Sequence, residues 1–225
     1  MMNARAIKNH LYEQVARIGR AVANEKRLEL IELLCQGEKS VEDLAAGIDT
    51  SFRLTSAHLK TLRDAQMVKT RRDGKRIFYS IAGPSVADLW VQLRTEAELR
   101  LEELQVALAD LSVNHDVDAL DHKALLQKVR SGEVVMIDVR PEEEFAVAHL
   151  PLARSIPLKE LQQRLAELPS GTPVVAYCRG PFCLLATDAV KLLRRNGFQA
   201  MHLPDGVHEW RARGLPVHYP VGNPK

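Results

Sequence analysis

The chain is poor in cysteine, in aromatic side chains and in net charge. Its 225 residues include three cysteines, 5% aromatic residues and a formal net charge of +2 at pH 7. So few cysteines exclude a disulfide framework, and a reactive thiol among them indicates a reducing, cytoplasmic compartment. No apolar run has membrane length and the polar N-terminus is no signal peptide, so we expect no membrane partner. No cysteine and histidine cluster has metal-ligand spacing, so we expect no metal and no cofactor.

The most informative segment is residues 174–184, which read VVAYCRGPFCL. An apolar strand is predicted over residues 174–177, and an apolar helix over residues 184–193. The Gly/Pro loop between them starts at Cys178. In this arrangement the loop amides and the helix amino terminus point at the sulfur, which lowers its pKa and favours a bound anion. A thiolate presented in this way suits covalent chemistry, and an inert cysteine at a strand end is the alternative.

Three further blocks surround this loop in a fixed order. Residues 136–145 read MIDVRPEEEF, residues 148–157 read AHLPLARSIP and residues 203–210 read LPDGVHEW. Together with the cysteine loop they resemble the rhodanese family over about residues 118–221. The resemblance implies an α/β domain with a central parallel sheet and a thiosulfate or persulfide sulfurtransferase activity.

The resemblance also implies roles for individual residues. Cys178 would hold a sulfane sulfur as a persulfide, the loop backbone would cradle it, and Arg179 would attract an anionic donor. Asp138 and Arg140 would brace the loop, and we favour an internal ion-pair network over direct catalysis for these two and Glu144. The candidate catalytic residues are Cys178, Arg179, Asp138, Arg140 and Cys183, and the persulfide or anion loop is Gly180, Pro181 and Phe182.

Several positions depart from the family pattern. Ala148, Leu152 and Asp205 stand where glycine is usual, which leaves the loop detail open but not the fold. Leu184 stands where a cysteine phosphatase carries its phosphate-binding arginine, which disfavours phosphatase chemistry. Cys183 could attack a persulfide on Cys178, release hydrosulfide and form a disulfide. A small side chain facing the core is the alternative for Cys183.

The first half of the chain carries a local positive charge. Residues 50–80 contain eight basic and two acidic side chains, an excess of six charges in a nearly neutral protein. Such a patch is expected where a protein contacts phosphate backbones, although a solvated helix face can carry the same charge.

The pattern around this patch predicts a winged helix. Helices are predicted over residues 25–35, 41–46 and 52–65, with Asn24, Ser40 and Ser51 as the N-caps. Leu54, Leu59 and Leu62 are expected on the buried face of the third helix. Alternating basic and β-branched runs joined by Asp-Gly at positions 73 and 74 then predict a hairpin. Residues 8–95 resemble the ArsR-type family of bacterial repressors on the segments NEKRL (24–28), LTSAHLKTLR (54–63) and KRIFY (75–79).

The resemblance implies a homodimer bound to a double-stranded DNA operator with an inverted repeat. Four residues of the third predicted helix would enter the major groove, and six basic residues would contact phosphates. Plain surface solvation is the alternative for each of them. The groove residues are Arg53, Thr55, Ser56 and His58, and the phosphate contacts are Lys60, Arg63, Arg71, Arg72, Lys75 and Arg76.

The sensing residues common in this family are missing. Residues 40–44 read SVEDL, where metal-sensing members carry a C-x-C pair, and Cys35 is the sole cysteine of the winged-helix region. A dithiol bridge within that region is therefore excluded, and Cys35 is assigned to the core. We expect the added domain to supply the input.

A long helix is predicted from Pro84 to about Ser112, with an apolar stripe that forms a dimer seam, packs on the catalytic domain or packs locally. Residues 114–118 form a polar linker, and the first rhodanese helix is predicted over residues 119–129. We thus expect a winged helix-turn-helix DNA-binding and dimerisation domain over residues 1–113 and a rhodanese-like domain over residues 114–225.

These observations lead to one hypothesis and two rivals. The chain is predicted to be a cytoplasmic, dimeric DNA-binding regulator of repressor type. Its Cys178 would accept sulfane sulfur from thiosulfate, polysulfide or a small persulfide and thereby change DNA affinity. One rival is a sulfurtransferase enzyme that uses the winged helix to dimerise. The other is a constitutive repressor whose rhodanese domain is catalytically idle.

Overall fold

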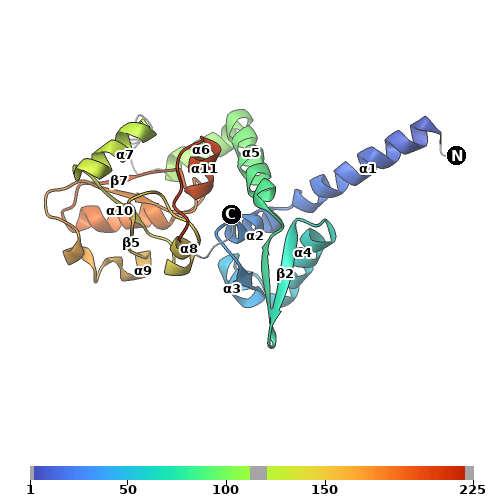
Figure 1. The fold of residues 1–225 in the computed structure, drawn as a ribbon, viewed down its shortest axis with the longest axis horizontal. Helices are drawn as coiled ribbons and strands as arrows, with labels where there is room; N and C mark the ends of the chain where they lie inside the picture. The colour runs from blue at the N-terminus through green and yellow to red at the C-terminus, as the bar shows by residue number, and fades with distance from the viewer. Residues whose placement is uncertain (1–2, 112–120, 221–225) are drawn as a thin grey trace. The chain divides into compact units, whose positions relative to one another are not determined.

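Short helices followed by a β-hairpin form the first of the two units into which the chain divides, Met1–Trp90 (Figure 1). The computed structural model describes residues 3–111 and 121–220. The predicted caps are confirmed, because the side chains of Asn24, Ser40 and Ser51 accept hydrogen bonds from amides in the first turns of α2, α3 and α4. The elements are α1 (Ala4–Val22), α2 (Glu25–Cys35), β1 (Lys39–Ser40), α3 (Val41–Gly47), α4 (Phe52–Asp64), β2 (Val68–Asp73), β3 (Arg76–Ile81) and the start of α5 (Pro84–Arg100).

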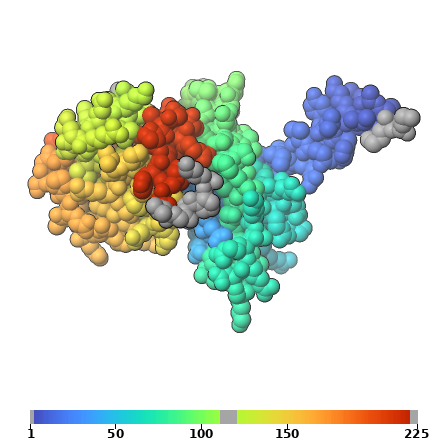
Figure 2. All heavy atoms as spheres, in the orientation of Figure 1, coloured from blue at the N-terminus to red at the C-terminus, as the bar shows by residue number. Residues whose placement is uncertain are grey.

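The hairpin of β2 and β3 is the predicted wing. The two strands pair antiparallel from Val68 opposite Ile81 to Asp73 opposite Arg76. Gly74 adopts a φ of 58°, the left-handed conformation that glycine tolerates best in such a turn. The unpredicted strand β1 pairs with β3, so the sheet order is β1-β3-β2. Figure 2 shows the hairpin tip standing out from the rest of this unit.

The buried face of α4 differs from the prediction by one position. Leu59 and Leu62 are fully buried as expected, but Leu54 is 47% exposed and Thr55 is fully buried in its place. Positions 55, 59 and 62 follow the spacing of four and three that places side chains on one helix face, whereas position 54 is turned about 100° away. The prediction that Leu54 faces the core was therefore wrong.

The long helix predicted from Pro84 to Ser112 is interrupted at Leu101. Helix α5 ends at Arg100, and α6 (Glu102–Leu111) begins after it. The carbonyl oxygen of Glu98 accepts a hydrogen bond from the Gln105 side chain at 2.8 Å, so a side chain serves a carbonyl at the end of α5. The predicted end at residue 112, the linker at residues 114–118 and the division between residues 113 and 114 lie outside the described residues.

The second unit, Val91–Lys225, is an α/β fold with a parallel sheet of order β5-β4-β6-β7 (Figure 1). Both predicted fold classes are thereby confirmed. The first rhodanese helix is α7, which the Asp121 side chain caps and which starts three residues later than predicted. The elements are α7 (His122–Ser131), β4 (Val135–Asp138), α8 (Glu142–Val147), β5 (Arg154–Ser155), α9 (Leu158–Leu161), η1 (Leu165–Glu167), β6 (Val174–Tyr177), α10 (Leu185–Arg195), β7 (Ala200–His202) and α11 (Val207–Ala212).

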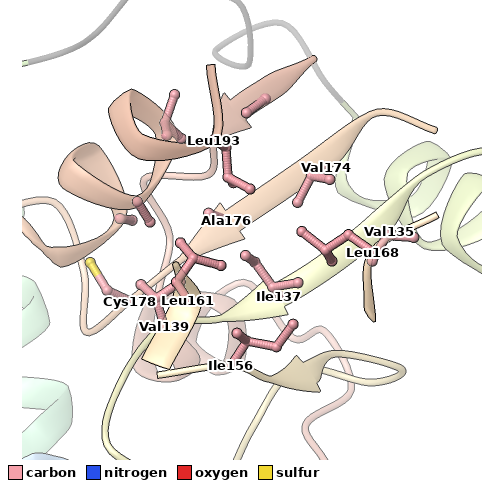
Figure 3. Packing of buried hydrophobic residues seen from close by; sticks show 14 of the residues in the cluster. Val135, Ile137, Val139, Ile156, Leu161, Leu168, Val174, Ala176, Cys178 and Leu193 are labelled. Carbon is pink, nitrogen blue, oxygen red and sulfur yellow. The ribbon is translucent and has the colours of Figure 1, made fainter. Parts of the chain in front are cut away.

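The central strands of this sheet are buried on both faces, which explains their continuous apolar sequence. Val174 and Ala176 of β6 pack with α9 and α10, while Val175 and Tyr177 pack with α7 and α11. Cys178 continues the side of Val174 and Ala176, because side chains alternate along a strand. Figure 3 shows its sulfur at the end of β6, at the margin of this apolar cluster.

Candidate functional site: a cysteine loop and a basic wing

Cys178 lies at the point where the strand order of the parallel sheet reverses. It follows the last residue of β6, and Tyr177 is the register partner of Asp138 at the end of β4. The chain leaves β4 toward β5 on one side, while β6 lies on the other side. Ligand sites of open α/β sheets form at the carboxyl ends of strands at such a switch point. The sheet topology therefore favours this loop as the functional centre of the second unit.

Cys178 and Cys183 form a buried thiol pair. Cys178 is 1% exposed and Cys183 is 8% exposed. The Cys178 thiol lies 3.1 Å from the carbonyl oxygen of Cys183, and the two thiols hydrogen-bond each other. None of the three cysteines forms a disulfide, and Cys35 is buried in the first unit. The loop thus brings together the two cysteines that the sequence singled out.

The two thiols titrate as a coupled pair in which the pKa of one is lowered and the pKa of the other is raised. The hydrogen bond from Cys178 lowers the pKa of Cys183 to about 6, with help from the backbone of Arg179 and its positive charge. Burial raises the pKa of Cys178, and the neighbouring Cys183 raises it further. The prediction of a lowered pKa at Cys178 was wrong for the reduced protein, because burial outweighs the backbone groups of Ala186 and Gly180 that favour its thiolate.

The Arg179 side chain is engaged by Glu144. Its Nε and Nη2 atoms donate to the two carboxylate oxygens at 3.0 and 2.9 Å, and Glu144 itself is buried. A bidentate pair of this kind is directional and strong. In this state the guanidinium braces α8 against the cysteine loop, which differs from the expected role as an attractor of an anionic donor.

Asp138 and Arg140 form a second buried ion pair at the end of β4. The Arg140 Nη2 atom lies 2.6 Å from the Asp138 carboxylate and also donates to the Ala148 carbonyl at 2.8 Å. The Tyr177 hydroxyl accepts a hydrogen bond from the Leu150 amide at 3.0 Å, and burial raises the pKa of Tyr177. This network ties the strand preceding Cys178 to the segment after α8, as expected for bracing residues.

Gly206 lies in close contact with the backbone of the cysteine loop, a contact that the sequence analysis did not predict. A Cβ built on Gly206 would lie 2.8 Å from the Cys178 carbonyl oxygen and nearer still to that of Arg179. Only glycine permits this approach of two backbones. Glu209 accepts a hydrogen bond from the Gly206 amide at 2.8 Å and so caps α11. The Gly-x-x-Glu spacing before an apolar position is the signal that could have identified this support.

Two departures from the family pattern have structural explanations. Leu152 stands in place of a glycine and keeps a left-handed φ of 66°, which costs a non-glycine residue about 1–2 kcal/mol. Asp205 replaces another glycine, and its carboxylate pairs with His122 at 2.6 Å and Arg213 at 2.8 Å. Asp205 thereby connects α7 with α11, the two helices on one face of the sheet.

Most of the predicted DNA-contacting residues are exposed on α4 and the wing. Ser56 and His58 are half-buried, and Thr55 is fully buried with its hydroxyl 3.0 Å from the Ser51 carbonyl oxygen. Thr55 therefore caps and packs the helix, and its assignment to the groove was wrong because it shares the face of Leu59. The exposed residues are Arg53, Lys60, Arg63, Arg71, Arg72, Lys75 and Arg76.

Part of the basic charge of this surface is locally paired. Arg71 makes a bidentate contact with Glu38, with a shortest distance of 2.6 Å, and its pKa is raised by that hydrogen bond. Arg76 lies 3.5 Å from Asp43, whereas Arg72 donates to the Gly74 carbonyl at 3.1 Å. Such exposed pairs are weak, so a competing phosphate can displace them.

The described part of the chain contains neither a metal-binding cluster nor a helix suited to cross a membrane. No group of three or more histidine, cysteine, aspartate or glutamate side chains in residues 3–111 and 121–220 could hold a metal ion. Within the same residues, no helix combines the length and the apolar character that a membrane crossing requires.

Comparisons with known proteins agree with this two-part architecture. The family described as rhodanese-like domain matches residues 121–213, and the family described as bacterial regulatory protein, arsR family, matches residues 24–70. The chain is 43% identical over 218 residues to the HTH-type transcriptional regulator Rv0324 of Mycobacterium tuberculosis, covering 96% of each protein. It is 30% identical over 108 residues to a sulfurtransferase of Allochromatium vinosum, covering 47% of this chain and 99% of that protein.

A solved structure is similar to the first unit. It is the homodimeric winged helix-turn-helix DNA-binding domain Mb0332 of Mycobacterium bovis, described as a possible ArsR-family transcriptional regulator. The identity is 39%, the match covers 46% of this chain and 95% of that chain, and the TM-score is 0.42. The near-complete match to Rv0324 shows the family: the chain belongs to the arsR family of bacterial regulatory proteins, as a helix-turn-helix transcriptional regulator that also contains a rhodanese-like domain.

Proposed function

We propose that this regulator senses reactive sulfur in the cytoplasm by accepting sulfane sulfur on Cys178. The observation that carries the proposal is the buried Cys178–Cys183 pair, with the Cys178 thiol 3.1 Å from the Cys183 carbonyl oxygen, in the same chain as a basic winged helix. A thiolate in such a loop is the group that attacks sulfane sulfur. The coexistence of this pair and a DNA-binding domain favours a signal passed from sulfur to DNA.

The chemistry would proceed in two balanced steps. Cys178 attacks the outer sulfur of thiosulfate while Cys183 takes up the proton of Cys178, the sulfur–sulfur bond breaks, and sulfite leaves with the electron pair. The Cys183 thiolate, after losing that proton, then attacks the inner sulfur of the Cys178 persulfide. A Cys178–Cys183 disulfide forms and hydrosulfide leaves. With a polysulfide donor the first leaving group is the shortened polysulfide.

We infer that the regulator acts as a homodimer on an operator with an inverted repeat. Helix α1 leaves an apolar stripe exposed along its length, which a second copy would cover. The stripe consists of Ile7, Leu11, Tyr12 and Val15. The exposed basic residues of α4 and the wing supply phosphate contacts, and a relative with a similar winged-helix domain is described as a homodimer.

A sulfurtransferase enzyme is the second candidate, because the second unit is similar to a sulfurtransferase over 99% of that protein. Burial favours the sensor. With Cys178 1% exposed, transfer to an external acceptor requires the loop to open in every turnover, whereas a sensor reacts once per signal. Steady-state turnover with thiosulfate and a thiol acceptor separates the two, because an enzyme sustains many turnovers.

The decisive experiment is the affinity of the purified protein for DNA from its own upstream region, at fixed salt, with and without polysulfide. We expect the Kd to change by about tenfold, within the usual range of coupling between sites, and to recover on reduction. The Cys178→Ser variant should not respond, and Cys35→Ser should respond as the wild type does. An unchanged wild-type Kd, despite mass-spectrometric proof of a persulfide on Cys178 or of the Cys178–Cys183 disulfide, would refute the proposal.

A further inference from the structure

Arg94 of helix α5 contacts the cysteine loop. Its side chain is 3% exposed and pairs with Glu209 at 2.9 Å and with Glu98 at 3.0 Å. Its guanidinium carbon lies 5.6 Å from the centre of the Phe182 ring, a distance at which a cation is attracted to an aromatic face. A Cβ built on Gly180 would lie 3.2 Å from its Nη1 atom. Arg94 therefore touches the loop between the two cysteines.

Arg94 also reaches the base of the loop through Glu209. One carboxylate oxygen of Glu209 accepts from Arg94, and the other accepts from the Gly206 amide at 2.8 Å. Gly206 in turn packs against the carbonyls of Cys178 and Arg179. The Arg94 side chain thus supports the loop directly at its apex and indirectly at its start.

Arg94 does not belong to the rhodanese-like domain as that family is defined. The family match begins at residue 121, whereas Arg94 lies in α5, which starts at Pro84 in the first unit and ends at Arg100 in the second. A helix that continues from the DNA-binding unit therefore supplies a buried charge to the sulfur site.

We propose that Arg94 is a positioning residue for the Cys178 loop and the residue through which α5 responds to sulfur on that loop. This inference rests on the proposed function. A persulfide adds one sulfur atom at a position that is 1% exposed and closely packed, so the loop must shift to accommodate it. A disulfide with Cys183 would displace the same residues. Either shift moves Gly180 and Phe182 against Arg94.

Because the Arg94–Glu209 ion pair is buried, the contact between Arg94 and the cysteine loop is expected to switch between two discrete arrangements, one without and one with sulfur on the loop. A guanidinium excluded from water cannot lose its carboxylate partner without a large cost, so Arg94 follows Glu209 or is released together with it. Coupling between two sites is reciprocal at equilibrium. Operator DNA must therefore change the equilibrium sulfur loading of Cys178 by the same factor by which sulfur changes DNA affinity.

The test is a double variant, Arg94→Gln with Glu209→Gln, which removes both members of the buried ion pair; Glu98, the other partner of Arg94, is 26% exposed and stays within reach of water. The readouts are the ratio of the Kd for upstream DNA with and without polysulfide, and the loading of Cys178 with and without DNA. We expect the ratio to fall from about tenfold to less than about twofold, and loading to become independent of DNA. The matched control is Arg100→Gln, an exposed arginine of the same helix paired with Glu96, which should keep the wild-type ratio.

A second variant, Phe182→Leu, keeps the Arg94–Glu209 pair and covers the case in which the double variant fails to fold by circular dichroism. We expect it to reduce the ratio by about half or more, because the cation loses its aromatic contact. If the double variant is folded and keeps the wild-type ratio of Kd values, the role of Arg94 is overturned. If the double variant is unfolded, a wild-type ratio in Phe182→Leu overturns it. Failure of the wild-type protein to respond would instead refute the proposed function itself.

Discussion

The two units place their functional side chains in opposite environments. On α4 and the wing, the basic residues are exposed and their ion pairs are within reach of solvent, so each acts almost independently. In the cysteine loop, the thiols and the surrounding ion pairs of Glu144, Asp138 and Arg94 are buried. A change at one of these positions alters the charge or packing of its neighbours. Single substitutions among the exposed basic residues of α4 and the wing should therefore each reduce DNA affinity by a small amount. Single substitutions around the cysteine loop should each cause a large loss of stability or of sulfur loading.

The Gly206→Ala variant is the strongest test of this contrast. The new Cβ would clash with the carbonyl oxygens of Cys178 and Arg179, which belong to backbone and cannot rotate away. We expect the second unit to lose about 1–3 kcal/mol of stability and Cys178 to lose sulfur loading. Urea denaturation and mass spectrometry measure the two effects. Gly83→Ala, which meets no atom within 4 Å, is the control, and equal effects of the two variants would contradict the prediction.

The second-largest expected effect is that of pH on the charge of the thiol pair and on sulfur loading. Because the pKa of Cys183 is lowered to about 6, the pair should lose its negative charge below that pH, and sulfur loading should fall about tenfold per pH unit. The thiolate also stabilises the fold fully above the ordinary pKa near 9, and this contribution is lost as the pH falls through about 6.

The thiolate absorbance of the reduced protein between pH 4 and pH 9 measures this transition directly, at an expected midpoint near 6. Cys183→Ser should abolish the transition, because the remaining Cys178 is buried and its pKa is raised. The Cys35→Ser variant serves as the control and should leave it in place. A transition that survives in Cys183→Ser would assign the thiolate to Cys178.

The DNA surface should show smaller and graded effects. Arg72→Ala should weaken binding to upstream DNA several-fold. It should also reduce the slope of the logarithm of the binding constant against the logarithm of salt concentration by about one unit, as loss of one phosphate contact does. Arg71→Ala should weaken binding less, because Arg71 must leave Glu38 before it can contact a phosphate. Fluorescence anisotropy over a range of salt concentrations measures both slopes. The comparison fails if Arg71→Ala has the larger effect.

The smallest effect is expected from Leu152→Gly. Leu152 is 55% exposed and holds a left-handed conformation, so glycine removes backbone strain and loses little apolar burial. The greater freedom of glycine in the unfolded chain offsets part of this gain. We expect a net stabilisation of about 0.5–1 kcal/mol by urea denaturation, without change in DNA affinity. A destabilised Leu152→Gly protein would show that the leucine side chain has a packing role.

The features predicted correctly from sequence depend on neighbours in the chain. The caps at Asn24, Ser40 and Ser51 bond to amides three residues away, and the hairpin forms where it was predicted, although its turn residues are Gly74 and Lys75 and not Asp73 and Gly74. The strand before Cys178 was likewise predicted from an unbroken apolar run. Interactions of such short range are encoded in the segment that forms them.

The wrong or missed assignments depend on residues far apart in the chain. The burial of Thr55 instead of Leu54 follows from the side of α4 that packs on the core, and a rotation of one residue was enough to exchange them. Arg179 is paired with Glu144, which lies 35 positions away, and Arg94 is paired with Glu209, which lies 115 positions away. No local spacing connects these partners.

The sequence by itself determined the two folds, the order of their blocks, and the position of two cysteines in one loop, because capping, turn chemistry and apolar periodicity act within short segments. Only the tertiary structure decided which thiol has the lowered pKa, which basic residues are already paired, and that Arg94 of α5 pairs with Glu209 beside the sulfur loop. Those properties depend on burial and on charges brought together by folding, and both are absent from the unfolded chain.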